Sequence, residues 1–307
     1  MMPVLSTPVI ASPLPFRIDL NSHIMSLGSC FSDEIGHRMA MGGLNVEKNP
    51  FGTLYNPASI CNAIRRILDD RPISTSDLVQ HEGLWHSWHH HGSFSQPSAN
   101  QTLEACNNRL HQAHLALQHT NLLSITFGTA WVFELLAAPD SSNCKSFDDW
   151  QLPAPSVVSN CHKLPRNLFS RRKLTIEEIT TMWHPLINEL LCTVPSLQIL
   201  FTVSPTRHLA DGAHGNQLSK STLLLAVDQL VSDYSERVFY FPAYEIVLDE
   251  LRDYRFFGPD MSHPSPLAAD IVWHRFQEAC MTPNVIQQIH NNAKRNLQKQ
   301  HIPLHQK

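Results

Sequence analysis

The sequence predicts an α/β fold in which helices cover both faces of a mostly parallel sheet. Short apolar runs typical of buried strands alternate along the chain with segments of helical spacing. Several of the helical segments begin with a capping residue or with proline at the first helical position. The 307 residues suffice for one large domain of this kind or two small ones.

The alternation begins with an apolar run at residues 24–27, which ends at Gly28 and predicts a buried strand. Helical spacing follows over residues 31–41 and stops at two glycines. The next helix begins at Asn56-Pro57, a cap followed by proline. The other expected elements are helix 57–68, strand 122–127, helix 175–191, strand 197–203, helix 217–234, strand 238–241 and helix 266–280.

The ends of the chain differ from this pattern. Residues 1–20 are proline-rich and predict an extended lead-in to a single domain over residues 21–280, with a polar excursion near residues 137–160. Residues 281–307 form a basic C-terminal tail, for which a surface helix and an arm for a membrane or partner both remain open. The tail has no acidic residue and four basic ones, Lys294, Arg295, Lys299 and Lys307.

Composition excludes several classes of protein. With 42% hydrophobic and 16% charged residues, the chain is too apolar for intrinsic disorder. A net charge of -4 gives no sign of a nucleic-acid partner, and no apolar run reaches the roughly 20 residues of a membrane span. The seven cysteines form no zinc-ligand spacing and the N-terminus has no basic signal region, so we expect no metal, no cofactor and a cytoplasmic location.

Two short segments carry candidate catalytic groups. Ser29 follows Gly28 between the first strand and its helix, where backbone N–H groups stabilise negative charge. Far downstream, Asp260 and His263 lie in one loop before the last predicted helix. A serine nucleophile needs an imidazole base, and the base needs a carboxylate to orient it. Each segment also has a common structural interpretation, the first as an ordinary helix cap and the second as a polar loop.

The order of these segments resembles that in the SGNH/GDSL hydrolase superfamily, and the residues of the individual motifs resemble those of its GSCFA family. The motif Gly-Ser-Cys-Phe-Ala is present as Gly28-Ser29-Cys30-Phe31-Ser32, with serine in the last position. Further similar segments run in order from about residue 20 to 280. They are Asn49-Pro50-Phe51-Gly52-Thr53, Tyr55-Asn56-Pro57, Thr126-Phe127-Gly128-Thr129-Ala130-Trp131, Asn160-Cys161-His162-Lys163, Thr202-Val203-Ser204-Pro205, Arg207-His208, Ser219-Lys220, Tyr240-Phe241-Pro242-Ala243-Tyr244-Glu245 and Asp260-Met261-Ser262-His263-Pro264.

The resemblance implies a flavodoxin-like three-layer sandwich and a Ser29–His263–Asp260 triad. It also implies an oxyanion hole formed by the backbone of Ser29, a glycine N–H, for which Gly52 is the candidate, and an asparagine side chain. The asparagine is missing, because the corresponding segment reads Gly128-Thr129-Ala130-Trp131. The Thr129 hydroxyl or Asn160 are the candidates to replace it.

Other conspicuous residues leave alternatives open. Alternation in His86-Ser87-Trp88-His89-His90-His91 places His89 and His91 on one face of a strand, as a pocket wall, a solvated loop or a metal site. Asn160 and His162 are interpreted as pocket-lining or as loop residues. Arg207 and His208 follow a strand end, where Arg207 either holds a substrate anion or forms a structural ion pair. Cys30 is a second candidate nucleophile or a packed core residue.

The leading hypothesis is a serine-dependent esterase or O-acyltransferase that acts on a small acyl ester, with a saccharide ester among the expected substrates. The alternative is a non-catalytic protein that retains the fold and binds a ligand or a carbohydrate. The Ser29, Asp260 and His263 set favours the enzyme, and the missing asparagine favours the binding protein.

Overall fold

A five-stranded parallel sheet forms the centre of the molecule in the computed structural model, which describes residues 7–136 and 156–300. Its strands are β1 (His23–Gly28), β2 (Asn45–Lys48), β5 (Leu122–Phe127), β9 (Gln198–Val203) and β10 (Val238–Tyr240). They lie in the order β2-β1-β5-β9-β10, which is the flavodoxin-like winding. Gly28 lies opposite Thr126, and Phe127 opposite Val203, so β1, β5 and β9 end at one edge. The predicted α/β fold is confirmed.

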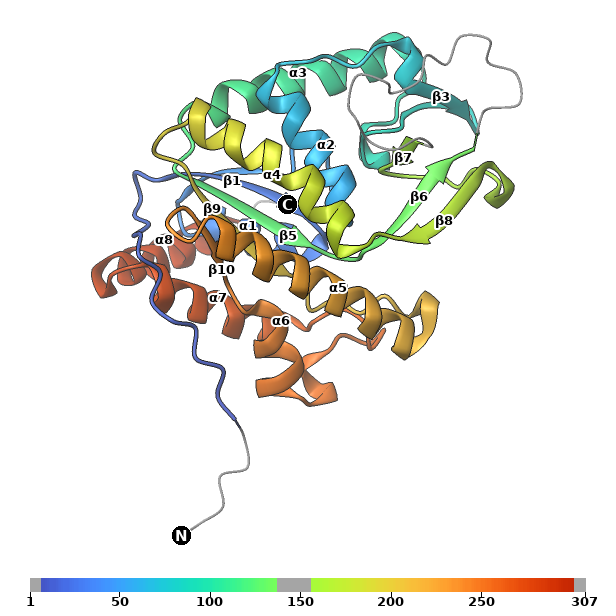
Figure 1. Cartoon of the computed structure of the whole chain (residues 1–307). Helices are drawn as coiled ribbons and strands as arrows, with labels where there is room; N and C mark the ends of the chain where they lie inside the picture. Colours follow the sequence, from blue (N-terminus) through green and yellow to red (C-terminus); the bar gives the residue numbers. More distant parts are fainter. Residues whose placement is uncertain (1–6, 137–155, 301–307) are drawn as a thin grey trace, which may run out of the picture.

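Helices cover both faces of this sheet (Figure 1). One face carries α2 (Pro57–Leu68), α3 (Ala99–Leu117), α4 (Ile176–Thr193) and α5 (Gly212–Asp233), and the other carries α1 (Cys30–Met41), α6 (Ala243–Glu245), α7 (Pro266–Cys280) and α8 (Pro283–Gln300). Successive side chains of β1 point to opposite faces of the sheet. Met25 and Leu27 pack in the hydrophobic core under the first set of helices, and Ile24 packs in the core under the second set. Burial on both faces explains why the strands are continuous apolar runs.

A smaller lobe of antiparallel strands lies beyond the carboxyl edge, because β6 follows β5 after only residues 128–130 (Figure 1). It contains the hairpin β3 (Leu78–His81) and β4 (Leu84–Ser87), and the sheet β7-β6-β8 formed by β6 (Trp131–Leu135), β7 (Ser156–Val158) and β8 (Phe169–Lys173). The expected excursion near residues 137–160 lies outside the described residues up to 155. Its last part, β7, pairs with β6.

Short helical turns complete the chain. They are the 3-10 turns Thr75–Asp77, Gly92–Phe94, Arg166–Leu168, Leu209–Asp211 and Tyr254–Phe256, and the π-helical turn Ile246–Leu251.

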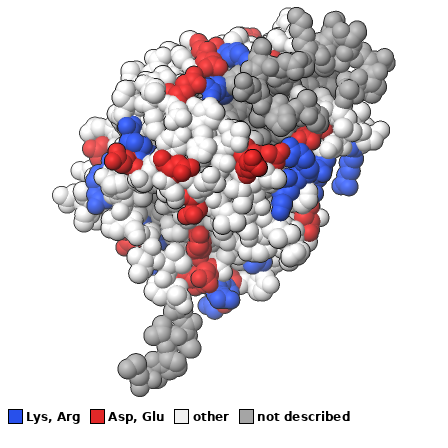
Figure 2. Space-filling model, viewed as in Figure 1, with Lys and Arg blue, Asp and Glu red and all other residues white. Residues whose placement is uncertain are grey.

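Residues 283–300, in the expected tail, form α8, which packs on α1. Ile289 is buried against Gly42, while Asn292 and Asn296 donate side-chain hydrogen bonds to the carbonyl oxygens of Gly42 and Met41. Among the described residues, none of the helices combines the length and apolar character that crossing a membrane requires. On the face shown in Figure 2, Lys and Arg lie in small groups among Asp and Glu, separated by broad uncharged surface.

Candidate active site

Ser29 lies at the carboxyl end of β1 and caps the N-terminus of α1. Its backbone has the extended conformation of a cap residue, but its side chain makes no capping hydrogen bond. The residue is fully buried, and Oγ has no hydrogen-bond partner within the described residues. The hydroxyl thus has no competing hydrogen bond and lies at the positive end of a helix dipole.

Gly28 holds Ser29 close to the neighbouring strand. A Cβ at Gly28 would lie 2.4 Å from the carbonyl oxygen of Thr126, and φ is +153°, so only glycine fits here. Asn49 accepts from the N–H of Gly28 over 2.8 Å, and its amide donates to Asp33 over 2.6 Å. The carbonyl of Gly28 accepts from Leu54. The turn that carries Ser29 is therefore anchored on several sides.

Asp260 and His263 are hydrogen-bonded to each other in the loop before α7. Oδ1 of Asp260 accepts the backbone N–H groups of Ser262 and His263, and Oδ2 lies 2.5 Å from His263 Nδ1. The backbone and side-chain hydrogen bonds from His263 hold the pKa of Asp260 well below its usual range. Because an ionised carboxylate only accepts, Nδ1 carries the proton and Nε2 presents a lone pair. Nε2 makes no hydrogen bond within the described part of the chain, which leaves it free to accept a proton.

The segment that follows β9 connects this loop with α1. The backbone N–H of Arg207 donates to the carbonyl of Ser262 over 2.9 Å, and Thr206 Oγ1 lies 3.8 Å from Cys30 Sγ. Cys30 directly follows Ser29, so residues 204–208 attach the Asp260–His263 loop to the end of the sheet where Ser29 lies.

His208 lies close to Ser29, and both residues border Gly128. A Cβ placed on Gly128 would lie 3.3 Å from Ser29 Cβ, 3.5 Å from His208 Nε2 and 3.0 Å from the carbonyl oxygen of Tyr55. The Tyr55 and His208 rings meet edge to face with centroids 6.0 Å apart. Burial, followed by the charges of Lys220 and His263, lowers the pKa of His208 to about 4. His208 is therefore neutral at neutral pH.

Lys220, buried in α5, fixes the ends of β5 and β9. Its Nζ donates to the carbonyl oxygens of Gly128 and Ser204, each over 2.6 Å, and burial lowers its pKa to about 7. The preceding Ser219 accepts from the N–H of Ala130 over 2.8 Å. The sequence pattern alone assigns Ser219 and Lys220 no role, because a lysine inside a helix normally indicates a solvated position.

The expected oxyanion donors are engaged elsewhere in this structure. The N–H of Gly52 donates to the carbonyl of Asn49 over 2.7 Å, closing a turn in which Gly52 has a φ of +75°. The N–H groups of Gly128 and Thr129 both donate to Tyr55. The Thr129 hydroxyl lies 3.0 Å from Ser219 Oγ and accepts from the N–H of Trp131. The N–H of Ser29 makes only a long 3.4 Å bond to Thr126.

The chain matches the model of the GSCFA family over residues 23–276, from β1 into α7. This protein belongs to the GSCFA family. The match includes Ser29, Asp260 and His263. A comparison with curated proteins found no match.

Solved structures similar to this GSCFA protein include three carbohydrate esterases. A family 3 enzyme from Talaromyces cellulolyticus is 8% identical with a TM-score of 0.37, covering 88% of this chain and 99% of that one. A family 2 enzyme from Clostridium thermocellum is 13% identical with a TM-score of 0.36, covering 86% and 65%. An acetyl xylan esterase from Butyrivibrio proteoclasticus is 10% identical with a TM-score of 0.38, covering 89% and 64%.

Three of the expected site residues, His91, Asn160 and His162, lie in the segments of the smaller lobe, and His91 contacts Gly52 in the loop between β2 and α2. A Cβ on Gly52 would lie 2.4 Å from His91 Cβ, and Asn160 Nδ2 lies 4.0 Å from the corresponding position on Gly92. Asn160 accepts from the N–H of His162, and His162 Nε2 lies 2.8 Å from the carbonyl oxygen of Ser87. Gly52 is also connected with the Ser29 turn, because its N–H donates to Asn49, whose side chain accepts from the N–H of Gly28.

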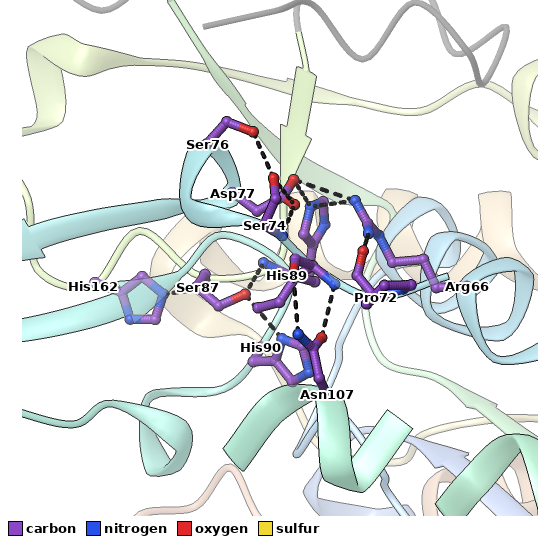
Figure 3. A network of polar contacts seen from close by, with 11 residues as sticks. Arg66, Pro72, Ser74, Ser76, Asp77, Ser87, His89, His90, Asn107 and His162 are labelled. Carbon is purple, nitrogen blue, oxygen red and sulfur yellow. Dashed lines mark hydrogen bonds and ion pairs between the residues drawn. The ribbon is translucent and has the colours of Figure 1, made fainter. Parts of the chain in front are cut away.

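The histidine-rich segment is a buried polar network and not the continuous strand that its alternation predicts (Figure 3). β4 ends at Ser87. Beyond it the His89 side chain is buried, with Nε2 3.1 Å from Asp77 Oδ1 and 3.0 Å from Arg66 Nη2. His90 stacks on Phe51 with ring centroids 4.2 Å apart. The prediction that His89 and His91 share a strand face is thus wrong. Across residues 7–136 and 156–300, no three His, Cys, Asp or Glu side chains are arranged to hold a metal.

Arg207 has no acidic partner within the described residues. Its guanidinium lies 4.1 Å from the centroid of the Phe257 ring and 5.5 Å from that of Tyr254. The three side chains line a surface hollow of about 210 Å³, together with Arg252 and Asp253 among others. Because the backbone of Arg207 also holds Ser262, this hollow adjoins the loop that carries His263.

Proposed function

We propose that this GSCFA protein is a serine-dependent enzyme of the SGNH hydrolase type, which hydrolyses or transfers a small acyl ester. One observation carries the proposal. At one edge of the sheet, an uncapped serine hydroxyl begins a helix, and a tethered loop supplies an Asp260–His263 pair with a free Nε2. An ordinary cap would use the hydroxyl of Ser29, and an ordinary loop histidine needs no carboxylate on Nδ1.

The proposed reaction has two stages. Oγ of Ser29 forms a bond to the ester carbonyl carbon while its proton moves to His263 Nε2, and the carbonyl electron pair moves onto oxygen. The tetrahedral intermediate collapses, the alkoxide leaves with the proton from His263, and Ser29 retains the acyl group. In the second stage, His263 takes a proton from water or an acceptor hydroxyl, whose oxygen attacks the acyl carbonyl. His263 then returns the proton to Ser29 Oγ as the acyl group leaves. Asp260 remains ionised throughout and holds the imidazole in place.

The surroundings of the Asp260–His263 loop favour a substrate whose alcohol part combines apolar faces with polar groups. The hollow beside the loop is lined by the faces of Tyr254 and Phe257 and by the Arg207 cation, a combination of apolar faces and convergent polar groups that suits a small ligand. A saccharide ester has this mixture of apolar faces and hydroxyl groups. Because Ser29 is fully buried in this structure, side chains that cover it must move before the acyl group reaches Oγ.

The second candidate is a non-catalytic protein that binds a ligand on the same fold. The observation in its favour is that the Gly52, Gly128 and Thr129 donors are all bonded within the protein, which leaves no preformed oxyanion hole of the expected kind.

Labelling with a fluorophosphonate probe separates the two candidates, because only an activated serine reacts. We expect the probe to label the wild-type protein and not Ser29→Ala, with p-nitrophenyl acetate turnover lost in the same variant. Ser235→Ala, at an exposed turn position, is the matched control and should be labelled normally. Absence of labelling and of Ser29-dependent turnover in the folded wild-type protein would favour the binding protein.

A further inference from the structure

Two buried polar atoms without partners converge on the carboxyl edge of the sheet. Ser29 Oγ and His208 Nε2 are both shielded from solvent and lack hydrogen bonds within the described residues. Ser29 Cβ and His208 Nε2 both lie within 3.5 Å of the position that a Cβ on Gly128 would occupy. A buried polar group without a partner costs about 1–3 kcal/mol. Two such groups near one point indicate a binding position in which a polar ligand atom supplies the missing hydrogen-bond partner.

The neighbouring donors cannot serve that ligand atom without breaking bonds. Gly52, Gly128 and Thr129 use their N–H groups in the turns that hold the loops, and the Thr129 hydroxyl is used by Ser219 and Trp131. The long bond of Ser29 N–H leaves that donor weakly engaged. His208 Nε2 is buried and has no partner in the described part of the chain, so in the tautomer that carries the proton on Nε2 it is a side-chain donor available to that ligand atom.

The environment of His208 suits a neutral donor better than a base. Burial lowers the pKa of His208 to about 4, with smaller contributions in the same direction from Lys220, His263 and Arg171 and an opposing one from Asp211, so the imidazole is neutral at pH 7. A general base works best with a pKa near the working pH. A neutral imidazole keeps its N–H and does not transfer the proton to the intermediate. The carboxylate partner that marks a base belongs to His263 instead.

We propose that His208 donates an oxyanion-hole hydrogen bond through Nε2–H, in the place of the asparagine side chain that the sequence lacks. The inference rests on the proposed function. When Ser29 Oγ bonds to the carbonyl carbon, the electron pair moves onto the carbonyl oxygen, and His208 stabilises that charge without giving up its proton. The proton of Ser29 goes to His263. Lys220, which bonds Gly128 and Ser204, keeps the end of β9 and the Gly128 turn in register.

Substitution of His208 tests this role with kcat and KM for p-nitrophenyl acetate. His208→Leu removes the donor, and His208→Phe removes it while keeping a ring beside Tyr55. Loss of one oxyanion donor lowers kcat about 10²- to 10³-fold, and we expect this fall in both variants with KM changed by less than about threefold. His208→Gln returns an N–H donor and should recover at least about tenfold of the lost kcat.

The controls distinguish this inference from the proposed function. His119→Leu, an exposed histidine at the amino edge of the sheet, should match the wild-type protein. Thermal unfolding of each variant shows whether it is folded. If His208→Leu does not fold, His208→Phe alone tests whether the donor is needed. Ser29-dependent turnover that survives His208→Leu and His208→Phe within threefold overturns the inference alone. Equal loss in the Leu, Phe and Gln variants, with turnover retained in His263→Ala, makes His208 the base and also overturns it. Wild-type protein without Ser29-dependent turnover refutes the proposed function and this role together.

Discussion

Lys220 Nζ donates a hydrogen bond of 2.6 Å to the carbonyl oxygen of Gly128, inside a region closed to solvent. A second bond of equal length reaches Ser204, so one side chain of α5 joins the ends of β5 and β9. Ser29 and His208 both border Gly128. The Gly128 turn that borders the candidate nucleophile is thus held by a lysine to which the described structure gives no hydrogen bond with Ser29 or His208.

We expect Lys220→Met to destabilise the protein and to lower catalysis. The variant leaves two buried carbonyl groups without a donor, at a cost of about 1–3 kcal/mol for each, partly offset because a charge is no longer buried. Urea unfolding should therefore show a loss of about 2 kcal/mol, and kcat for p-nitrophenyl acetate should fall about tenfold or more because the Gly128 turn shifts. Lys294→Met, an exposed lysine on α8, is the control. A variant with unchanged kcat would contradict a positioning role for Lys220.

Asp260→Asn tests the role of the carboxylate. The amide retains the shape of the side chain but removes the ionised acceptor that orients His263, and the loss of such an orienting carboxylate lowers kcat by up to about 10⁴-fold in other triads. We expect a fall of at least about 10²-fold in kcat and a slower reaction with the fluorophosphonate probe. His263→Ala should be at least as inactive.

Asp249→Asn provides the matched control, since Asp249 is an exposed carboxylate in the π-helical turn. Equal turnover in the wild-type protein and Asp260→Asn would leave the Asp260–His263 pair with a structural role only.

The buried histidines predict a loss of stability in mild acid. Burial lowers the pKa of His89 to about 4, against about 6.5 for an unfolded chain. Between these two values the unfolded chain binds the proton and the folded one does not, so stability falls as the pH drops from about 6.5 to 4. For His89 the full difference corresponds to about 3 kcal/mol. The pKa of His162 is also lowered to about 4 by burial, so its effect adds in the same window.

Free energies of unfolding at pH 7.5 and pH 5 measure this effect. The wild-type protein should be less stable at pH 5, and His89→Gln, which cannot titrate, should lose less stability between the two values. His119→Gln should behave as the wild-type protein, because His119 is exposed. Equal stability of the wild-type protein at both pH values would contradict the prediction.

The strong elements were predictable from local pattern. Strands β1, β5, β9 and β10 are apolar runs because both faces of the sheet are covered, and α2 and α7 carry cap and proline signals that depend on adjacent residues. The weak elements were missed. β2 is an edge strand with no buried residue, and α3 buries a polar residue, Thr102, in its apolar stripe, so neither shows a clear hydrophobic period.

The candidate residues Ser29, Asp260 and His263 could be selected from sequence because each is positioned by its immediate neighbours. Gly28 sets the strand-to-helix turn, and Asp260 and His263 are only three residues apart. Only the tertiary structure shows which N–H donors are already hydrogen-bonded within the protein. The partners of the Gly52 and Gly128 N–H groups are backbone carbonyls, which carry no sequence signal. The tertiary structure likewise decided that His208 and Lys220 are buried beside Ser29, since burial results from packing between distant segments. Local chemistry thus selected the candidate nucleophile and the candidate acid–base pair, whereas long-range packing determined which polar atoms around them remain free.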